Sequence, residues 1–128
     1  MPPTFLTLDE ALEIHRDQIE RYGGRAGIRD MALLQSALAM PQTSFGGKYL
    51  HTDLFEMAAA CLFHIVRNHP FLDGNKRAGT VAALIFLALN DKEVRVTDAA
   101  LVRIVLSVAR GETGKSGIAE FLRMHSAR

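Results

Sequence analysis

Along much of the chain, hydrophobic residues recur every three to four positions, which is the spacing of amphipathic helices. A Thr-x-x-Glu capping box beginning at Thr7 predicts the start of a first helix, and paired glycines at 23–24 predict its end. Asp30 is placed to cap a second helix, which should end before Pro41. Each segment carries its apolar residues in a stripe, which is the face expected to point inward.

The middle of the chain holds its most hydrophobic segments. Residues 54–68 and 76–90 are apolar on nearly every face, which is typical of helices buried at the centre of a domain. Two further helices are expected: one over 99–109 behind a cap at Asp98, and a last one starting at Ser116. Cys61 lies within the first buried segment, where it is interpreted as a small core residue rather than a nucleophile.

Short β elements are also indicated. Residues 43–50 contain two glycines between aromatic residues, a pattern that favours a turn or small hairpin, and residues 94–96 suggest a short strand. No repeat, low-complexity segment or Pro/Gly-rich linker divides the sequence. The predicted fold is therefore all-α, a compact bundle of about six helices with a small β-hairpin, in one domain over residues 1–128.

Composition narrows the setting and the partners. The net charge of +1 argues against broad nucleic-acid binding, which needs many Lys and Arg side chains to neutralise phosphates. The N-terminus lacks the pattern of a signal peptide, and the longest apolar run, 81–89, is too short to span a bilayer. With a single cysteine excluding any internal disulfide, we expect a soluble cytoplasmic protein without direct membrane or nucleic-acid contacts.

One loop concentrates chemically active side chains: His69-Pro70-Phe71-Leu72-Asp73-Gly74-Asn75-Lys76-Arg77, called the 69–77 loop below. It joins the two most buried segments, so rigid elements should hold both of its ends. A plain turn between helices needs a glycine and a capping group, whereas this loop gathers a histidine, an acid, an amide and two basic residues. The excess of polar groups suggests a binding or catalytic role.

Binding of a polyphosphate would explain this composition. Gly74 allows close approach of the backbone, and the free N–H groups at the start of the next helix attract anions. Lys76 and Arg77 in that first turn are unfavourable by about a few tenths of a kcal/mol each unless an anion binds there. Asp73 could then hold Mg²⁺ against the phosphates, and His69 could accept a proton from an attacking hydroxyl.

A purely structural interpretation competes with this one. Asp73 and Asn75 could simply cap the following helix, and His69 could bond a carbonyl at the end of the preceding helix. For each residue taken alone the structural interpretation is favoured, but for the cluster as a whole the phosphate site is. A metal centre formed by His64 and His69 is disfavoured, because a spacing of five does not place them on one helical face.

A second phosphate-like stretch occupies residues 109–116, called the 109–116 connection below. It resembles the Gly-x-x-x-x-Gly-Lys-Ser/Thr motif, but Ala109 replaces the first glycine and the stretch follows a helix rather than a strand. It is interpreted as a turn between helices, with Gly111 just past a helix end, and the NTPase interpretation is rejected.

The 69–77 loop resembles the motif of the Fic/Doc superfamily, in which His-Pro-Phe precedes an acidic residue, Gly-Asn and a basic tail. Lys76 resembles the death-on-curing (Doc) branch, because Fic adenylyltransferases typically carry Gly at that position. Residues 19–24, 52–56, 84–87 and 111–112 also resemble Doc segments in the same order. The resemblance extends from about Leu8 to Arg123. Gly74 departs from the best-known Doc toxin, which has Ala there.

The resemblance implies a toxin of a type II toxin–antitoxin system, with a cognate antitoxin as partner. Such toxins phosphorylate a threonine of elongation factor Tu with the γ-phosphate of ATP and arrest translation. It also implies His69 as the catalytic base and Asp73 as the residue that serves Mg²⁺. Gly74, Asn75, Lys76 and Arg77 then bind the phosphates of ATP, and residues 43–50 form a flap that docks the target.

Two other functions are compatible with the same fold. The first is transfer of AMP to a target hydroxyl, as in Fic relatives, and Lys76 weighs against it. The second is a binding module without catalysis, and the intact His69, Asp73, Asn75 and Arg77 weigh against that. No Ser/Thr-x-x-x-Glu-x-x-Gly-Asn inhibitory motif is present, so restraint by a separate antitoxin is expected.

Overall fold

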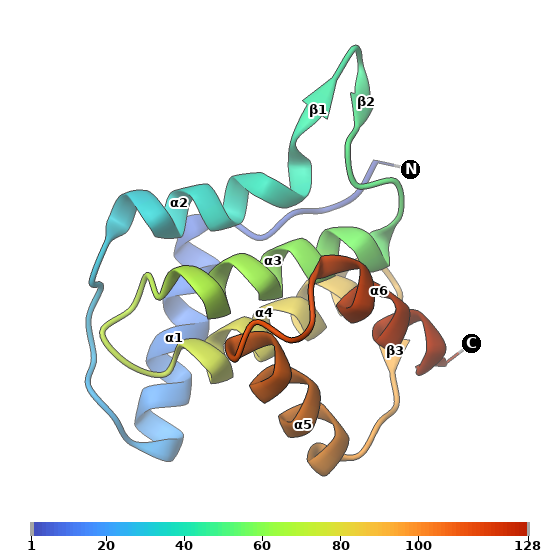
Figure 1. Ribbon diagram of the computed structural model, residues 1–128. Helices are drawn as coiled ribbons and strands as arrows, with labels where there is room; N and C mark the ends of the chain where they lie inside the picture. Colours follow the sequence, from blue (N-terminus) through green and yellow to red (C-terminus); the bar gives the residue numbers. More distant parts are fainter. Residues whose placement is uncertain (1, 128) are drawn as a thin grey trace.

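Six α-helices account for most of residues 2–127, the part of the chain that the computed structural model describes (Figure 1). In chain order they are α1 (Leu8–Tyr22), α2 (Met31–Ala39), α3 (Leu54–Asn68), α4 (Asn75–Leu89), α5 (Asp98–Ala109) and α6 (Lys115–Met124). A 3₁₀ turn, η1 (Met40–Gln42), follows α2. The predicted all-α class with about six helices is therefore confirmed.

Local capping explains where the helices begin. The capping box at Thr7 forms with both of its hydrogen bonds, and the side chains of Asp30 and Asp53 cap α2 and α3. Three predicted starts shift by one residue. Helix α4 begins at Asn75 rather than at residue 76. Thr97 rather than Asp98 caps α5, because its hydroxyl accepts from the N–H of Ala100. The last helix starts at Lys115 rather than Ser116, behind Gly114.

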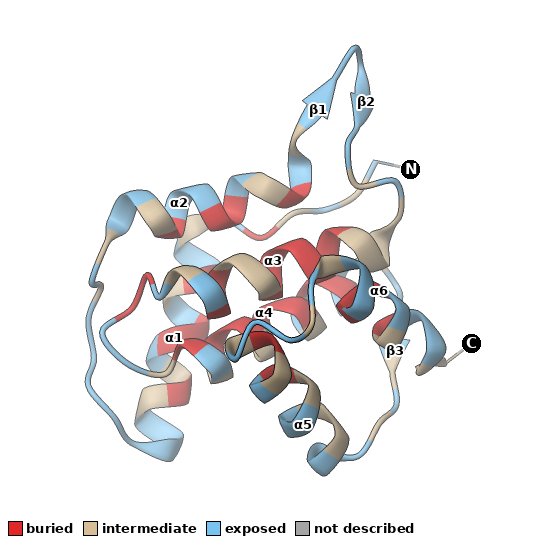
Figure 2. Ribbon diagram, in the orientation of Figure 1, coloured by how far each residue is buried: buried red, intermediate tan, exposed pale blue. Residues whose placement is uncertain are grey.

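Helices α3 and α4 form the buried centre, as their apolar sequences predict (Figure 2). Small residues at their interface let the backbones approach closely: a Cβ on Gly79 would lie 3.0 Å from Cγ2 of Val66 and 3.3 Å from the carbonyl oxygen of Leu62. Cys61 is part of this core, where burial raises the pKa of its thiol to about 12. This central pair is the rigid mount on which the 69–77 loop is built.

Two short strand pairs complete the fold. Strands β1 (Ser44–Phe45) and β2 (Lys48–Tyr49) form the predicted hairpin, which projects away from the helices in Figure 1. The short strand predicted over 94–96 lies instead at β3 (Glu93–Val94). Its antiparallel partner is β4 (Ser126–Ala127), which the sequence pattern did not indicate. Among the described residues, no helix has the length and hydrophobicity needed to cross a membrane.

Candidate active site

The 69–77 loop begins where α3 ends in an unusual conformation. His69 is the C-cap of α3 and adopts left-handed backbone angles, with φ 51° and ψ 57°. Pro70 and Phe71 then turn inward and are buried, whereas the His69 side chain stays exposed. Within the described residues the imidazole of His69 forms no hydrogen bond, so the predicted alternative that it bonds a carbonyl at the end of α3 is wrong. Its ring is free to meet a substrate.

Asn75 shapes the loop from inside. Its side chain is buried, its Oδ1 accepts from the N–H of Phe71 at 3.0 Å, and its Nδ2 donates to the Phe71 carbonyl at 3.0 Å. The alternative that Asp73 or Asn75 caps the next helix is wrong, because the N-cap of α4 is Gly74 in a left-handed conformation and the helix has no side-chain cap hydrogen bond. The role of Asn75 in holding phosphates stays a prediction.

Asp73 carries an ionised carboxylate at the rim of the loop. Its Oδ2 accepts from the N–H of Arg25 at 3.1 Å, and its Oδ1 accepts from the N–H of Gly74 at 2.8 Å. These two backbone hydrogen bonds, with the charges of Arg77 and Arg25 adding to them, lower the pKa of Asp73. The side chain is exposed, so each carboxylate oxygen keeps a lone pair for a further ligand.

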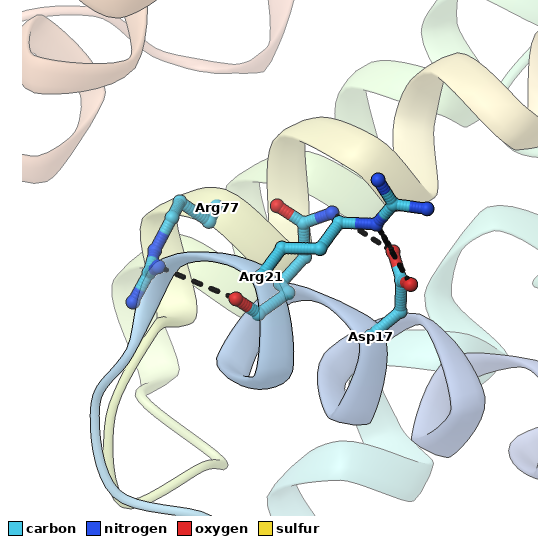
Figure 3. A network of polar contacts seen from close by, with 4 residues as sticks. Asp17, Arg21 and Arg77 are labelled. Atoms are coloured by element: carbon cyan, nitrogen blue, oxygen red, sulfur yellow. Dashed lines mark hydrogen bonds and ion pairs between the residues drawn. The ribbon is translucent and has the colours of Figure 1, made fainter.

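The two basic residues of the loop point in different directions. Arg77 reaches back to the end of α1, where it donates to the carbonyl of Gly23 at 2.9 Å and to that of Gln18 at 3.4 Å. Figure 3 draws Arg77 within a network of polar contacts. Figure 3 also shows the Asp17–Arg21 ion pair of α1 beside it. Lys76 is exposed in the first turn of α4. Arg77 therefore helps to fix the loop, and Lys76 is exposed beside it. The binding of phosphates by Lys76 and Arg77 stays a prediction.

His15 of α1 also supports the 69–77 loop, and it was not among the predicted site residues. His15 is buried, its ring stacks on that of Phe71 with centroids 3.8 Å apart, and its Nε2 donates to the carbonyl of Asp73 at 2.8 Å. A signal was present in the sequence. His15 lies on the apolar stripe between Leu12 and Ile19, where a polar side chain needs a buried partner.

The segment that joins α1 to α2 also lies along the loop, as Figure 1 shows at the left of the molecule. The N–H of Leu72 donates to the carbonyl of Gly27 at 3.1 Å, and Ile28 forms an antiparallel bridge with Phe71. A Cβ on Gly24 would lie 2.7 Å from Oδ2 of Asp73, so only glycine fits this close approach. The pairing holds the loop backbone in one conformation.

Together these contacts leave the start of α4 suited to binding an anion, with the carboxylate of Asp73 at its edge. The first N–H groups of α4 have no side-chain cap, and the helix dipole adds partial positive charge there. Among the described residues no three His, Cys, Asp or Glu side chains gather into a metal site. Asp73 alone fits Mg²⁺ in the way this ion usually binds, through one carboxylate together with substrate phosphates and water.

Comparison with known proteins identifies the group to which this arrangement belongs. A family model described as the Fic/DOC family matches residues 5–87, which include the whole 69–77 loop and the α1 and α1–α2 residues that support it. The chain belongs to the Fic/DOC family. The match to this family confirms the resemblance predicted from the loop, and its extent over α1 to α4 agrees with the packing that builds the site.

Two relatives in the Fic/DOC family carry the Doc name. Protein kinase doc from Escherichia phage P1 is 34% identical over 116 residues, which cover 90% of this chain and 90% of the relative. Toxin Doc from Mycolicibacterium smegmatis is 42% identical over 69 residues, or 54% of this chain and 53% of the relative. Both matches support the Doc branch that Lys76 indicates.

The 109–116 connection lies outside the part of the chain that the Fic/DOC model matches. As predicted, it is a turn between α5 and α6 and no strand leads into it. Gly111 follows the end of α5 with φ 79°, the left-handed conformation expected of a glycine past a helix end. The rejection of a P-loop is consistent with this geometry.

Proposed function

We propose that this protein is the toxin of a type II toxin–antitoxin system and that it transfers the γ-phosphate of ATP to a threonine of elongation factor Tu, thereby arresting translation. The observation that carries the proposal is the exposed, unbonded His69 imidazole on the same rigid loop as the ionised Asp73 and the uncapped start of α4. The relative named Protein kinase doc supports phosphoryl transfer.

Each residue has a distinct part in this proposal. His69 takes the proton from the threonine hydroxyl as the hydroxyl oxygen attacks the γ-phosphorus, the bond from that phosphorus to the β–γ bridging oxygen breaks, and ADP leaves. For this step His69 needs an accessible ring nitrogen. Lys76 and the N–H groups of the first turn of α4 bind the negative charge of the phosphates. Asn75 and Arg77 keep the loop closed around that charge through their bonds to Phe71 and Gly23.

Asp73 is the residue proposed to hold Mg²⁺, which, when bound, neutralises phosphate charge during the transfer. Its lowered pKa keeps the carboxylate ionised across the neutral range, as a magnesium ligand must be. The bonds from the N–H groups of Arg25 and Gly74 fix the direction of the carboxylate before any ligand arrives. That preorganisation avoids a reorganisation cost during the reaction.

Transfer of AMP is the second candidate, because the same loop type serves it in Fic relatives. Lys76 distinguishes the two reactions: its side chain occupies space at the first turn of α4 that a glycine would leave open. We propose that this side chain blocks the adenylyl-transfer pose and leaves the γ-phosphate as the group placed for attack. A catalytically silent binding module is the third candidate, and the preorganised His69 and Asp73 disfavour it.

The antitoxin is proposed to act from outside the chain. A groove of about 450 Å³ between α1, α4 and α5 opens beside Lys76 and Arg77, and its wall includes the exposed apolar side chains Tyr22, Val102 and Leu106. Such a surface next to the loop gives an antitoxin apolar contacts from which to control access.

The proposal is tested by incubating the protein with elongation factor Tu and ATP labelled at either the α- or the γ-phosphate. The expected result is transfer of label from the γ position alone, in the presence of Mg²⁺, to a threonine. Transfer from the α position would establish the adenylyltransferase instead. Absence of transfer to any lysate protein, together with normal growth on expression, would support the binding module.

A further inference from the structure

Arg29, in the segment between α1 and α2, reaches across to the end of α3. Its Nε donates to the carbonyl of His69 at 2.6 Å, and its Nη2 donates to the carbonyl of Asn68 at 2.7 Å. Both acceptors belong to the last turn of a helix, where carbonyls lack intrahelical partners and the dipole favours a cation. The planar guanidinium of Arg29 therefore provides hydrogen-bond donors for two of the free carbonyls at the C-terminus of α3.

The backbone of the same residue extends this contact. The N–H of Arg29 donates to the carbonyl of Pro70 at 2.7 Å, and the N–H of Asp30 donates to the same oxygen at 3.0 Å. Arg29 thus bonds three consecutive carbonyls, those of Asn68, His69 and Pro70. The chain is held on both sides of the His69 α-carbon.

The conformation of His69 requires such restraint. A left-handed backbone is unfavourable for a residue with a Cβ and persists only where the surroundings impose it. His69 is at φ 51° and ψ 57°, and within residues 2–127 its own side chain forms no hydrogen bond that would fix it. Among the described residues Arg29 supplies the side-chain bond to the His69 carbonyl, so it controls the direction in which the imidazole leaves the backbone.

We propose that Arg29 is a positioning residue that holds His69 in its left-handed conformation and so aims the imidazole at the attacking hydroxyl. The inference rests on the proposed role of His69 as the base. Arg29 acts through backbone carbonyls and not through the nucleotide. Loss of its side chain should therefore slow the transfer step without weakening ATP binding.

The experiment compares Arg29→Ala and Arg29→Lys with Arg123→Ala. Arg123 is a matched control, because it donates at 2.8 Å to Asp53, the residue that caps the opposite end of α3. A displaced catalytic group commonly costs about 10²-fold in rate, so Arg29→Ala should lower kcat about 10- to 100-fold with KM for ATP nearly unchanged. Arg29→Lys keeps the charge but not the fork and should recover part of kcat, whereas Arg123→Ala should keep the parent kcat.

A second readout is independent of the substrate. The NMR signals of the His69 imidazole should shift and broaden in Arg29→Ala and remain at the parent positions in Arg123→Ala. If the parent protein transfers no γ-phosphate, the proposed function fails, yet the imidazole signals still decide the positioning role. If Arg29→Ala does not fold, Arg29→Lys carries both measurements.

Three results would overturn the inference. The first is a kcat of Arg29→Ala equal to that of the parent protein. The second is a raised KM for ATP at constant kcat, which would place Arg29 on the nucleotide. The third is an unchanged set of His69 imidazole signals in a folded variant that lacks the guanidinium.

Discussion

The 69–77 loop and the 109–116 connection are similar in composition and in position. Each joins two helices, contains glycine and basic residues, and leads into a helix that begins behind a glycine and has no side-chain cap: Gly74 precedes α4 and Gly114 precedes α6. By residue type and helix N-terminus alone, both are candidates for a phosphate. The two differ in where their polar groups find partners.

In the 109–116 connection several polar groups bond neighbours in sequence, and its distant partners come from α3: Arg67 donates to the carbonyl of Ala109 at 3.0 Å, and Nζ of Lys115 lies 3.5 Å from Nε2 of His64. Arg110 pairs with Glu112 at 3.1 Å, the N–H of Glu112 bonds the carbonyl of Ser107 at 2.9 Å, and the hydroxyls of Ser107 and Thr113 are in contact. In the 69–77 loop the partners come from α1 and the segment after it, far away in sequence, through His15 among others. Both regions therefore have distant anchors, and they differ in the elements that supply them: α1 and the segment after it for the 69–77 loop, and α3 for the 109–116 connection.

The largest expected difference between the two regions is catalytic. His69→Ala should reduce label transfer by about 10²- to 10⁴-fold, the usual loss of a general base, and should abolish growth arrest. Lys115→Ala, in the 109–116 connection, should transfer label at the parent rate. Thermal melting of both proteins checks that they are folded. If the His69→Ala protein arrests growth like the parent, His69 is not the catalytic base.

A smaller catalytic effect is expected at the carboxylates. Asp73→Asn keeps an oxygen that can accept from the loop backbone but loses the charge for Mg²⁺, so the transfer rate should fall about 10²-fold. The matched variant in the other region is Glu112→Gln, which removes only an exposed ion pair with Arg110 and should leave the rate unchanged. Transfer rates of Asp73→Asn and Glu112→Gln, measured at several Mg²⁺ concentrations, distinguish the two variants. Equal magnesium dependence in Asp73→Asn and the parent would contradict the metal assignment.

The two N-cap glycines should respond oppositely in stability. Gly74 is left-handed, with φ 74°, and an added Cβ would lie 3.2 Å from Cδ1 of Ile19, so Gly74→Ala should lower the free energy of unfolding by about 1–2 kcal/mol. Gly114 has an extended backbone and nothing near its Cβ position. Gly114→Ser should therefore add a cap worth about a few tenths of a kcal/mol. Urea denaturation measures both changes in the free energy of unfolding. A destabilised Gly114→Ser would contradict the expectation that the two positions respond oppositely.

The smallest expected effect is a dependence of stability on pH near the 109–116 connection. Burial, followed by the positive charge of Lys115, lowers the pKa of His51 and of His64 below 6.5. The unfolded chain then binds protons first, so stability is complete above pH 6.5 and declines as the pH falls below it. Lys115→Ala should flatten this decline, measured as urea midpoints at several pH values. An equal slope with and without Lys115 would show that its charge does not act on these histidines.

Much of the fold was predictable because its signals are local. Capping residues such as Thr7 and Asp53, and the apolar composition of the two central segments, depend on near neighbours in sequence. The loop itself was also visible as an unusual run of polar residues. Strand β4 was missed because a two-residue strand has no pattern of its own and is defined only by its partner, β3.

The supporting residues of the site were not predictable in the same way. Arg29 lies in an exposed connection, and nothing near it in sequence shows that its side chain bonds the carbonyls of residues 68 and 69. His15 had a weak signal as a polar residue on an apolar stripe, but its partners, Phe71 and the carbonyl of Asp73, become apparent only when α1 packs against the loop. Such contacts depend on tertiary packing.

The central claim is that the nucleotide phosphates bind the start of α4 and not the equally uncapped start of α6. The most direct measurement is titration of the isotope-labelled protein with Mg·ATP, followed by the amide NMR signals of each residue. If the phosphates bind at the start of α4, the amide signals of Gly74, Asn75 and Lys76 should shift strongly and those of Gly114 and Ser116 should not. Shifts confined to the start of α6, with the amides of the 69–77 loop unmoved, would contradict it.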